Sequence, residues 1–85
     1  MSDLSRSDIQ DRVLAVISEV LSIDATGISN EASIPDDLGA TSIDKVELIL
    51  TIEDEFGGSI PEQDIEKIVT VGDVIDYVEN HLNAG

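Results

Sequence analysis

The chain has 85 residues, and its 4 Lys or Arg against 19 Asp or Glu give a formal net charge of −15 with no cysteine. This length fits one domain. The charge disfavours nucleic acid and anionic membrane surfaces as partners, because phosphate binding needs basic patches, and the missing cysteines exclude disulfides and thiolate metal sites. A basic protein partner fits the charge better; alternatively, acidity only keeps a small protein soluble.

The first residues, 1–10, are polar and lack the apolar region of a secretory signal. No apolar run approaches the ~18 residues of a membrane-spanning helix. We therefore expect a cytoplasmic protein without a membrane span.

The first predicted helix begins near Ser7 and ends near Ser22. Ser7 and Gln10 have the spacing of a capping box. Apolar residues then recur at helical spacing, namely Ile9, Val13, Val16, Ile17, Val20 and Leu21.

A long connection follows, from about residue 23 to residue 41, and contains the helix breakers Gly27, Pro35 and Gly39. A structureless loop of this length is uncommon in a compact domain. We therefore expect its apolar residues to attach it to the core: Ile23, Ile28, Ile34 and Leu38.

The second predicted helix spans 42–56, with Thr41 as its N-cap and Gly57 just beyond its end. A short helix over 62–67 follows Pro61, and a last helix begins after Thr70 and extends to Leu82. The predicted fold is all-α: a small antiparallel bundle of three main helices plus one short helix, with a long first loop.

The second helix carries two apolar stripes. A rotation of about 100° per residue places one stripe on the side that serves the core, namely Leu48, Ile49, Ile52 and Phe56. The other stripe, on nearly the opposite side, consists of Ile43, Val46 and Leu50, with Glu47 and Asp54 among them and Asp44 and Thr51 beside them. An apolar strip edged by acids suits a docking surface; the alternative is that both stripes are buried between helices.

Ser42 stands at the head of this helix, and a nucleophilic serine needs an adjacent base. The single histidine is His81, far along the chain, where it suits the last turn of a helix. Ser42 is therefore a poor catalyst. Its position suits an attached anion such as a phosphate ester, but the position alone favours a plain capping serine.

The segment D-L-G-A-T-S-I-D-K-V-E-L, residues 37–48, resembles the phosphopantetheine attachment motif of acyl carrier proteins, usually D-L-G-A-D-S-L-D-x-V-E-L. The likeness continues through I-Q-D-R-V (9–13), I-E-D-E-F (52–56), I-P-E-Q-D-I-E-K-I-V-T-V (60–71) and I-D-Y-V (75–78). The G-G-x-S-L pattern of peptidyl carriers is missing. The resemblance covers nearly the whole chain, so we expect residues 1–85 to form a single acyl-carrier domain.

The resemblance implies a 4′-phosphopantetheine on Ser42 whose thiol holds acyl groups as thioesters, and a protein that is not an enzyme and needs no metal. It implies two kinds of partner: a phosphopantetheinyl transferase, and the basic faces of enzymes that synthesise or transfer acyl chains in fatty-acid or related pathways. We expect the carrier itself to be a monomer. The second helix would dock them through its acidic residues Asp44, Glu47, Glu53 and Asp54 and its apolar residues Ile43, Val46 and Leu50.

Thr41 stands where Asp is usual in this family, and Ile43 where Leu is usual. These differences leave open a specialised carrier for a polyketide, lipid-modification or other secondary pathway. An acidic interaction module that is never loaded is a second alternative. A calcium loop over residues 24–35 is disfavoured, because Ser29 and Pro35 replace the Gly and Glu of an EF-hand.

Overall fold

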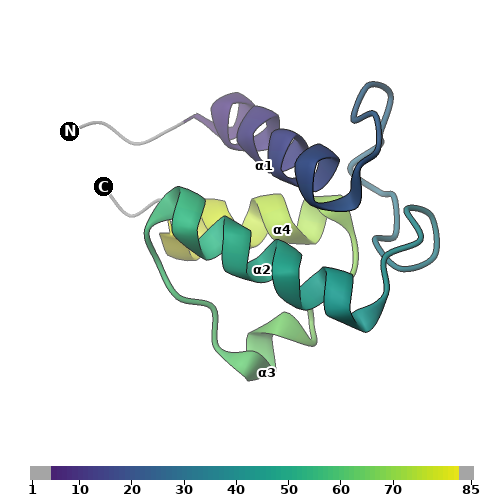
Figure 1. The fold of residues 1–85 in the computed structure, drawn as a ribbon. Helices are drawn as coiled ribbons and strands as arrows, with labels where there is room; N and C mark the ends of the chain where they lie inside the picture. Colours follow the sequence, from purple (N-terminus) through teal and green to yellow (C-terminus); the bar gives the residue numbers. More distant parts are fainter. Residues whose placement is uncertain (1–4, 83–85) are drawn as a thin grey trace.

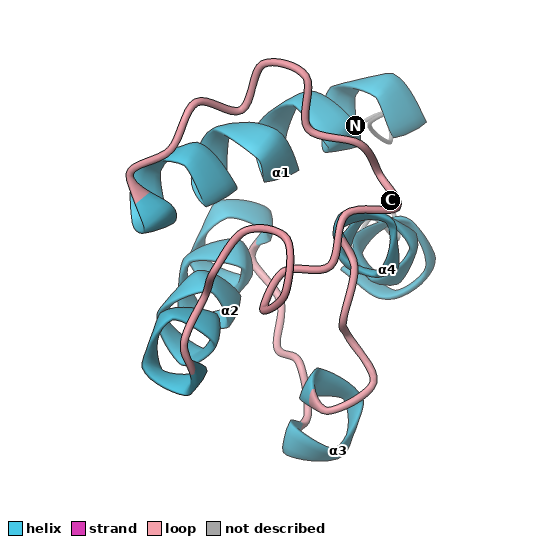
Figure 2. Ribbon diagram, turned by 90° about the vertical axis from the view of Figure 1, so that its right-hand side faces the viewer, coloured by secondary structure: helices cyan, strands magenta, loops and turns pink. Residues whose placement is uncertain are grey.

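The computed structural model describes residues 5–82. Three main helices surround one core in this part of the chain: α1 (Arg6–Leu21), α2 (Ser42–Phe56) and α4 (Val71–Tyr77) (Figure 1). Helix α4 continues into a π-helical segment (Val78–Leu82). The short α3 (Glu62–Ile65) lies in the connection from α2 to α4. The predicted all-α fold of three main helices and one short helix is confirmed. Figure 2 shows the long first loop crossing the ends of the helices.

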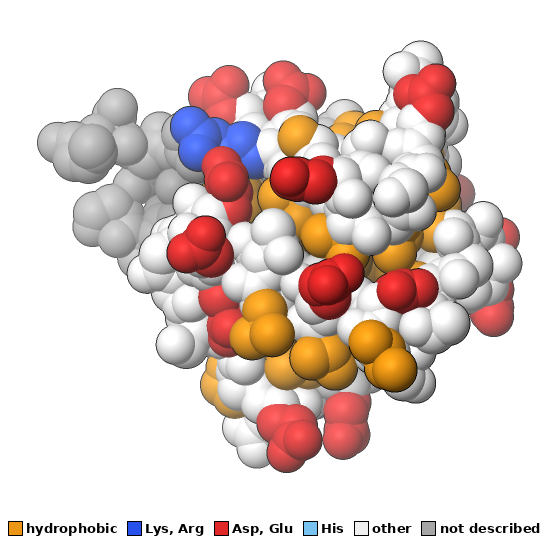
Figure 3. Space-filling model, in the orientation of Figure 1, with side chains coloured by type: hydrophobic (Ala, Val, Ile, Leu, Met, Phe, Trp, Pro, Cys, Tyr) orange, Lys and Arg blue, Asp and Glu red, His pale blue; other side chains and the backbone are white. Residues whose placement is uncertain are grey.

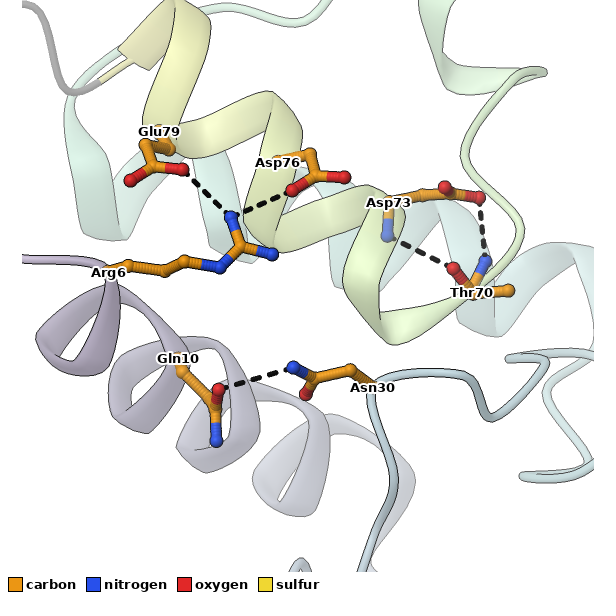
Figure 4. Close-up of polar contacts among 7 residues, drawn as sticks. All are labelled: Arg6, Gln10, Asn30, Thr70, Asp73, Asp76 and Glu79. Atoms are coloured by element: carbon orange, nitrogen blue, oxygen red, sulfur yellow. Dashed lines mark hydrogen bonds and ion pairs between the residues drawn. The ribbon is translucent and has the colours of Figure 1, made fainter.

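The start of α1 differs from the prediction. The N-cap is Ser5 rather than Ser7: the Ser5 side chain accepts a hydrogen bond from the amide of Asp8. Both serines have a polar residue three positions later, so the pattern alone does not choose between them. The earlier start puts Arg6 in the first turn, where its guanidinium pairs with Asp76 and Glu79 at 2.8 Å each (Figure 4).

The two C-terminal helices also differ in extent from the prediction. Helix α3 ends at Ile65 instead of residue 67, because the amides of Lys67 and Ile68 turn back to the carbonyls of Asp64 and Ile65. This turn brings Ile68 into the core. The expected last helix is divided between α4 and the π-helical segment that ends at Leu82.

The long loop is attached to the core as expected: Ile34 is fully buried, and Ile23, Ile28 and Leu38 pack partly buried against the core. Backbone hydrogen bonds add a second attachment that the sequence did not indicate. The amide of Ile34 donates to the carbonyl of Val69 at 2.8 Å, and the amide of Val71 donates to Ala32 at 3.1 Å. The loop is therefore fixed to the start of α4 just before it enters α2.

The core is entirely aliphatic, and no polar or charged side chain is buried in it within the described residues. The core stripe of α2 is confirmed, since Leu48, Ile49 and Ile52 are buried and Phe56 packs partly buried beside them. Helix α1 supplies Ile9, Val13, Val16 and Ile17, and α4 with its π-helical extension supplies Val71, Val74, Ile75 and Val78.

Candidate functional site

Ser42 is the first residue of α2 and is exposed. The chain reaches it through a tight turn: Gly39 has a φ of 73°, a conformation that glycine adopts without the Cβ penalty. Ala40 follows, buried, with its amide bonded to the carbonyl of Ile34 at 3.2 Å. The turn thus has a buried anchor, and Ser42 is presented at a fixed corner of the molecule.

The capping of α2 is done by Thr41 and not by Ser42. The Thr41 hydroxyl accepts from the amide of Asp44 at 3.1 Å, and the Asp44 carboxylate accepts from the amide of Thr41 at 3.0 Å. No hydrogen bond joins the Ser42 hydroxyl to another residue in the range 5–82. The interpretation of Ser42 as a plain capping residue is therefore wrong, because its neighbour fills that role.

A small cavity of about 100 Å³ adjoins Ser42. Its walls combine the apolar Ile34, Pro35 and Ala40 with the side of α2 that carries Thr41, Ser42 and Lys45. The sequence reasoning did not single out Lys45. Its spacing of three residues from Ser42 was the available signal, because residues i and i+3 are neighbours on a helix surface.

His81 does not serve Ser42 as a base. It lines a different cavity and stacks on Tyr77, with ring centroids 4.3 Å apart. The Tyr77 hydroxyl donates to the Asp64 carboxylate at 2.8 Å, and the pKa of Tyr77 is raised, first by partial burial and then by this carboxylate. The nucleophile–base geometry of an acyl-transfer site is not formed at Ser42.

The second apolar stripe of α2 is exposed. Ile43 is 80% exposed, Val46 54% and Leu50 59%, so the alternative that both stripes are buried is wrong. Figure 3 shows exposed apolar atoms along the front of the molecule over α2, with acidic side chains around them. Such a surface fits an interface with a polar rim.

The four acidic residues predicted for docking fall into two kinds. Glu47 and Asp54 are exposed and form no ion pair with any residue that the structure describes. Asp44 and Glu53 are partly buried and have local partners: Asp44 completes the cap of α2, and Glu53 accepts from the amide of Ile60 at 2.6 Å. The latter two help to hold both ends of α2.

The loop considered for calcium contains a local turn. The carboxylate of Asp24 accepts from the amide of Thr26 at 2.9 Å, and this bond lowers the pKa of Asp24. Between residues 5 and 82, no group of three or more His, Cys, Asp or Glu side chains is arranged to hold a metal ion.

Near Lys45, the carboxylate of Asp73 caps α4 by accepting from the amide of Thr70 at 3.0 Å (Figure 4). It also accepts from the amide of Val69 at 3.0 Å. These bonds, that of Thr70 first, lower the pKa of Asp73, and the positive charge of Lys45 adds a smaller contribution. The cap of α4 and the head of α2 are thus electrostatically linked.

The family model for the phosphopantetheine attachment site matches residues 11–78, and the chain therefore belongs to this family. An acyl carrier protein of Thermotoga maritima is 45% identical over 78 residues, which are 92% of this chain and 96% of that protein. A solved structure from Mycobacterium tuberculosis, described as an acyl carrier protein, is 36% identical with a TM-score of 0.80 and covers 85% of this chain and 96% of that chain. Within the family, the chain functions as an acyl carrier protein, which carries a phosphopantetheine group and is not an enzyme.

Membership implies a phosphopantetheinyl transferase and acyl-chain synthesising enzymes as partners. None of the described helices has the length and apolar character needed to cross a bilayer.

Proposed function

We propose that Ser42 is the residue that carries 4′-phosphopantetheine, and that α2 delivers the acyl cargo by docking on partner enzymes. The observation that carries this proposal is the exposed Ser42 hydroxyl, left without a bonding partner among the described residues by the Thr41 cap and placed beside the exposed apolar stripe of α2. The arm supplies a thiol that forms a thioester with an acyl group.

The residues around Ser42 fit a phosphodiester at this position. The backbone amides of Ser42 and Ile43 lie in the first turn of α2 and donate to no acceptor within residues 5–82. Free amides at a helix start attract an anion. The amides, the dipole of α2 and the nearby Lys45 side chain together favour a negative group on the Ser42 oxygen.

Intact mass spectrometry tests the attachment site. Incubation with coenzyme A and a broad-specificity phosphopantetheinyl transferase should add one phosphopantetheinyl group to the wild type and none to Ser42→Ala. Ser59→Ala is the matched control, since Ser59 is also exposed and lies outside the helices, and it should be loaded normally. A Ser42→Ala protein that still gains the group would refute the assignment.

The proposed docking surface, called here the α2 face, consists of Ile43, Val46 and Leu50 with the acidic residues Asp44, Glu47, Glu53 and Asp54. The chain has a net charge of −15, and the acidic residues of this face suit the basic faces of transferases and synthases. The exposed Glu47 and Asp54 are the members available for ion pairs with a partner.

We further infer a monomeric, cytoplasmic carrier in which residues 1–85 form a single domain. Fatty-acid or related acyl-chain synthesis is our first proposal for the pathway. The alternative is a specialised pathway, and the observation that supports it is the presence of Thr41 and Ile43 on either side of Ser42. The interaction module that is never loaded predicts that protein isolated from its own cell has a bare Ser42. The intact mass of such protein shows whether Ser42 carries the arm, and the mass of an acyl cargo retained on the arm distinguishes the two pathways.

A further inference from the structure

Lys45 is unusual among the cations of this chain. Of the 4 basic residues, Arg6 and Arg12 form ion pairs between helices. Lys45 and Lys67 form none with any carboxylate of the described residues. Lys45 is nevertheless partly buried, whereas Lys67 is exposed. In a protein of such negative charge, the charge of Lys45 is therefore available to an additional anion near the head of α2.

The position of Lys45 indicates which anion that is. Lys45 and Ser42 stand three residues apart on α2 and line the same cavity. Neighbours at this spacing have Cβ atoms about 5–6 Å apart. A flexible lysine side chain at this distance reaches a phosphate group attached to the serine oxygen.

The cavity has a shape and chemistry that suit the beginning of the arm. Its volume of about 100 Å³ exceeds the ~10–15 Å³ that a cavity needs to hold one water molecule, so it has room for a small group. Ile34, Pro35 and Ala40 provide its apolar wall. A phosphodiester followed by a methylene and a carbon with two methyl groups would present charge to Lys45 and hydrocarbon to this wall.

We propose that Lys45 pairs with the phosphodiester on Ser42 and thereby holds the first part of the arm against the cavity formed by Ile34, Pro35 and Ala40. This inference rests on the proposed attachment at Ser42. It makes Lys45 a positioning residue of the loaded protein, which sets the direction in which the arm leaves the bundle.

A structural role for Lys45 is the competing explanation, because its charge also acts on Asp73 at the cap of α4. That carboxylate is already bonded to the amides of Thr70 and Val69. A structural role stabilises the unloaded and loaded proteins equally. A role toward the phosphodiester stabilises only the loaded protein.

The test measures melting temperatures of the unloaded and loaded forms of wild type, Lys45→Gln and Lys67→Gln, after mass spectrometry has confirmed loading. The readout is the loading increment, defined as the melting temperature of the loaded form minus that of the unloaded form. Lys67→Gln is the matched control, because it changes the net charge equally and Lys67 lines a different cavity.

We expect the increment of Lys45→Gln to be lower than that of wild type by about 2–4 °C at low salt, a difference typical of one ion pair in a domain of this size. The difference should shrink at roughly 0.5 M salt, because this is well above physiological ionic strength and the charges are then screened. Lys67→Gln should keep the wild-type increment. Equal increments in all three proteins would overturn the role of Lys45, whereas a wild type that acquires no group would overturn the proposed function itself.

Discussion

At the head of α2, adjacent residues perform separate tasks. Thr41 caps the helix through the amide of Asp44, and Ser42 keeps its hydroxyl free of bonds to the described residues. A serine that capped the helix would have its oxygen turned toward the backbone. The division of tasks therefore makes the Ser42 hydroxyl available to a modifying enzyme.

Thr41→Asp should speed loading by a transferase specific for fatty-acid carriers. The cap survives because either side chain can accept from the Asp44 amide, and cap residues differ by only a fraction of the ~0.5–2 kcal/mol that a cap contributes. A basic group on the transferase can then form an ion pair with the added carboxylate. We expect kcat/KM to rise up to about fivefold, the equivalent of roughly 1 kcal/mol, with most of the gain lost at high salt.

The double variant Thr41→Asp, Ile43→Leu completes this comparison, because it restores the usual D-S-L sequence and replaces the β-branched side chain of Ile43. Equal or lower rates for both variants would show that these two positions do not determine which transferase loads the carrier.

Asp73 should make part of the stability dependent on pH. Its carboxylate accepts hydrogen bonds from the amides of Thr70 and Val69 at the cap of α4, and these bonds hold the pKa of Asp73 below its ordinary value. A pKa that is lower in the folded state gives stability that is complete above the unfolded value and is lost as the pH falls through the folded value. Asp73→Ala should therefore cost about 1–2 kcal/mol of unfolding free energy at pH 7.

Below pH 3.8 the difference between the wild type and Asp73→Ala should decrease. Urea denaturation at a series of pH values measures it, and Asp54→Ala, which removes an exposed carboxylate from α2, serves as control. The lowest pH should be about 2.5, roughly one unit below the ordinary carboxylate range. If the difference in unfolding free energy between the wild type and Asp73→Ala stayed constant from pH 7 down to this value, the charge of Asp73 would not contribute to stability.

At the scale of the element, α2 is a helix with two apolar sides and two environments. One side supplies Leu48, Ile49 and Ile52 to the core, while the other leaves Ile43, Val46 and Leu50 in solvent. Side chains that remain this exposed gain little from folding, because much of their apolar area stays in water. The proposed docking of partners on this side would cover them beside the candidate attachment residue.

Leu48 and Leu50 provide a matched pair for this interpretation, since they have the same side chain two positions apart on opposite sides of α2. Leu48 is fully buried and Leu50 is 59% exposed. Leu48→Ala should cost about 2–5 kcal/mol of unfolding free energy. Leu50→Ala should cost less than about 1 kcal/mol and should weaken binding to a cognate enzyme. Equal destabilisation by the two substitutions, measured by urea denaturation, would be inconsistent with an exposed α2 face.

Glu47→Lys should slow association with a cognate basic enzyme without unfolding the bundle. Glu47 is exposed, so its side chain is not needed by the core. We expect the association rate constant to fall about 2- to 10-fold at low salt and its salt dependence to flatten, as is usual for rim charges. Surface plasmon resonance at several salt concentrations provides the measurement. Asp11→Lys, on an exposed position of α1, makes the same change in net charge; an equal effect of both would mean that net charge, and not the α2 face, steers the encounter.

The sequence was most informative where local chemistry decides the structure. The bounds of α2 follow from Thr41 and Gly57, and both α2 stripes follow from the helical period. It was least informative where distant segments meet. The bonds between the long loop and the start of α4 and the cavity beside Ser42 depend on tertiary contacts that no local pattern contains. The predicted start of α1 was wrong because two serines offered equivalent caps. The ion pairs of Arg6 with α4 and its extension were not visible in the sequence.

At the scale of the whole molecule, repulsion among carboxylates works against an aliphatic core. Within residues 5–82, three ion pairs between exposed side chains connect α1 to α2 and to the α4 end of the bundle. Exposed pairs contribute about 0–1 kcal/mol each. They offset only part of the repulsion that a net charge of −15 creates in a molecule whose extents are 35 × 28 × 19 Å.

The melting temperature should therefore rise with salt. At about 0.01 M salt the screening length is about 30 Å, close to the longest extent of 35 Å, so carboxylates repel one another across the whole molecule. At about 0.1 M it is about 10 Å, and only neighbours still interact. Relief of about 1 kcal/mol of repulsion corresponds to a rise of about 4–8 °C in a domain of this size.

Sodium chloride and magnesium chloride at equal ionic strength distinguish the causes of this rise. Screening alone predicts equal increases, and an additional increase with magnesium would indicate loose cation binding by the acidic surface. Calorimetry on Glu47→Gln, which removes one exposed negative charge, should show a higher melting temperature at low salt and a smaller salt effect than wild type, because there is less repulsion to screen. A wild-type melting temperature that stays constant or falls as salt is added would mean that the interhelical ion pairs, and not repulsion, dominate the electrostatics of the fold.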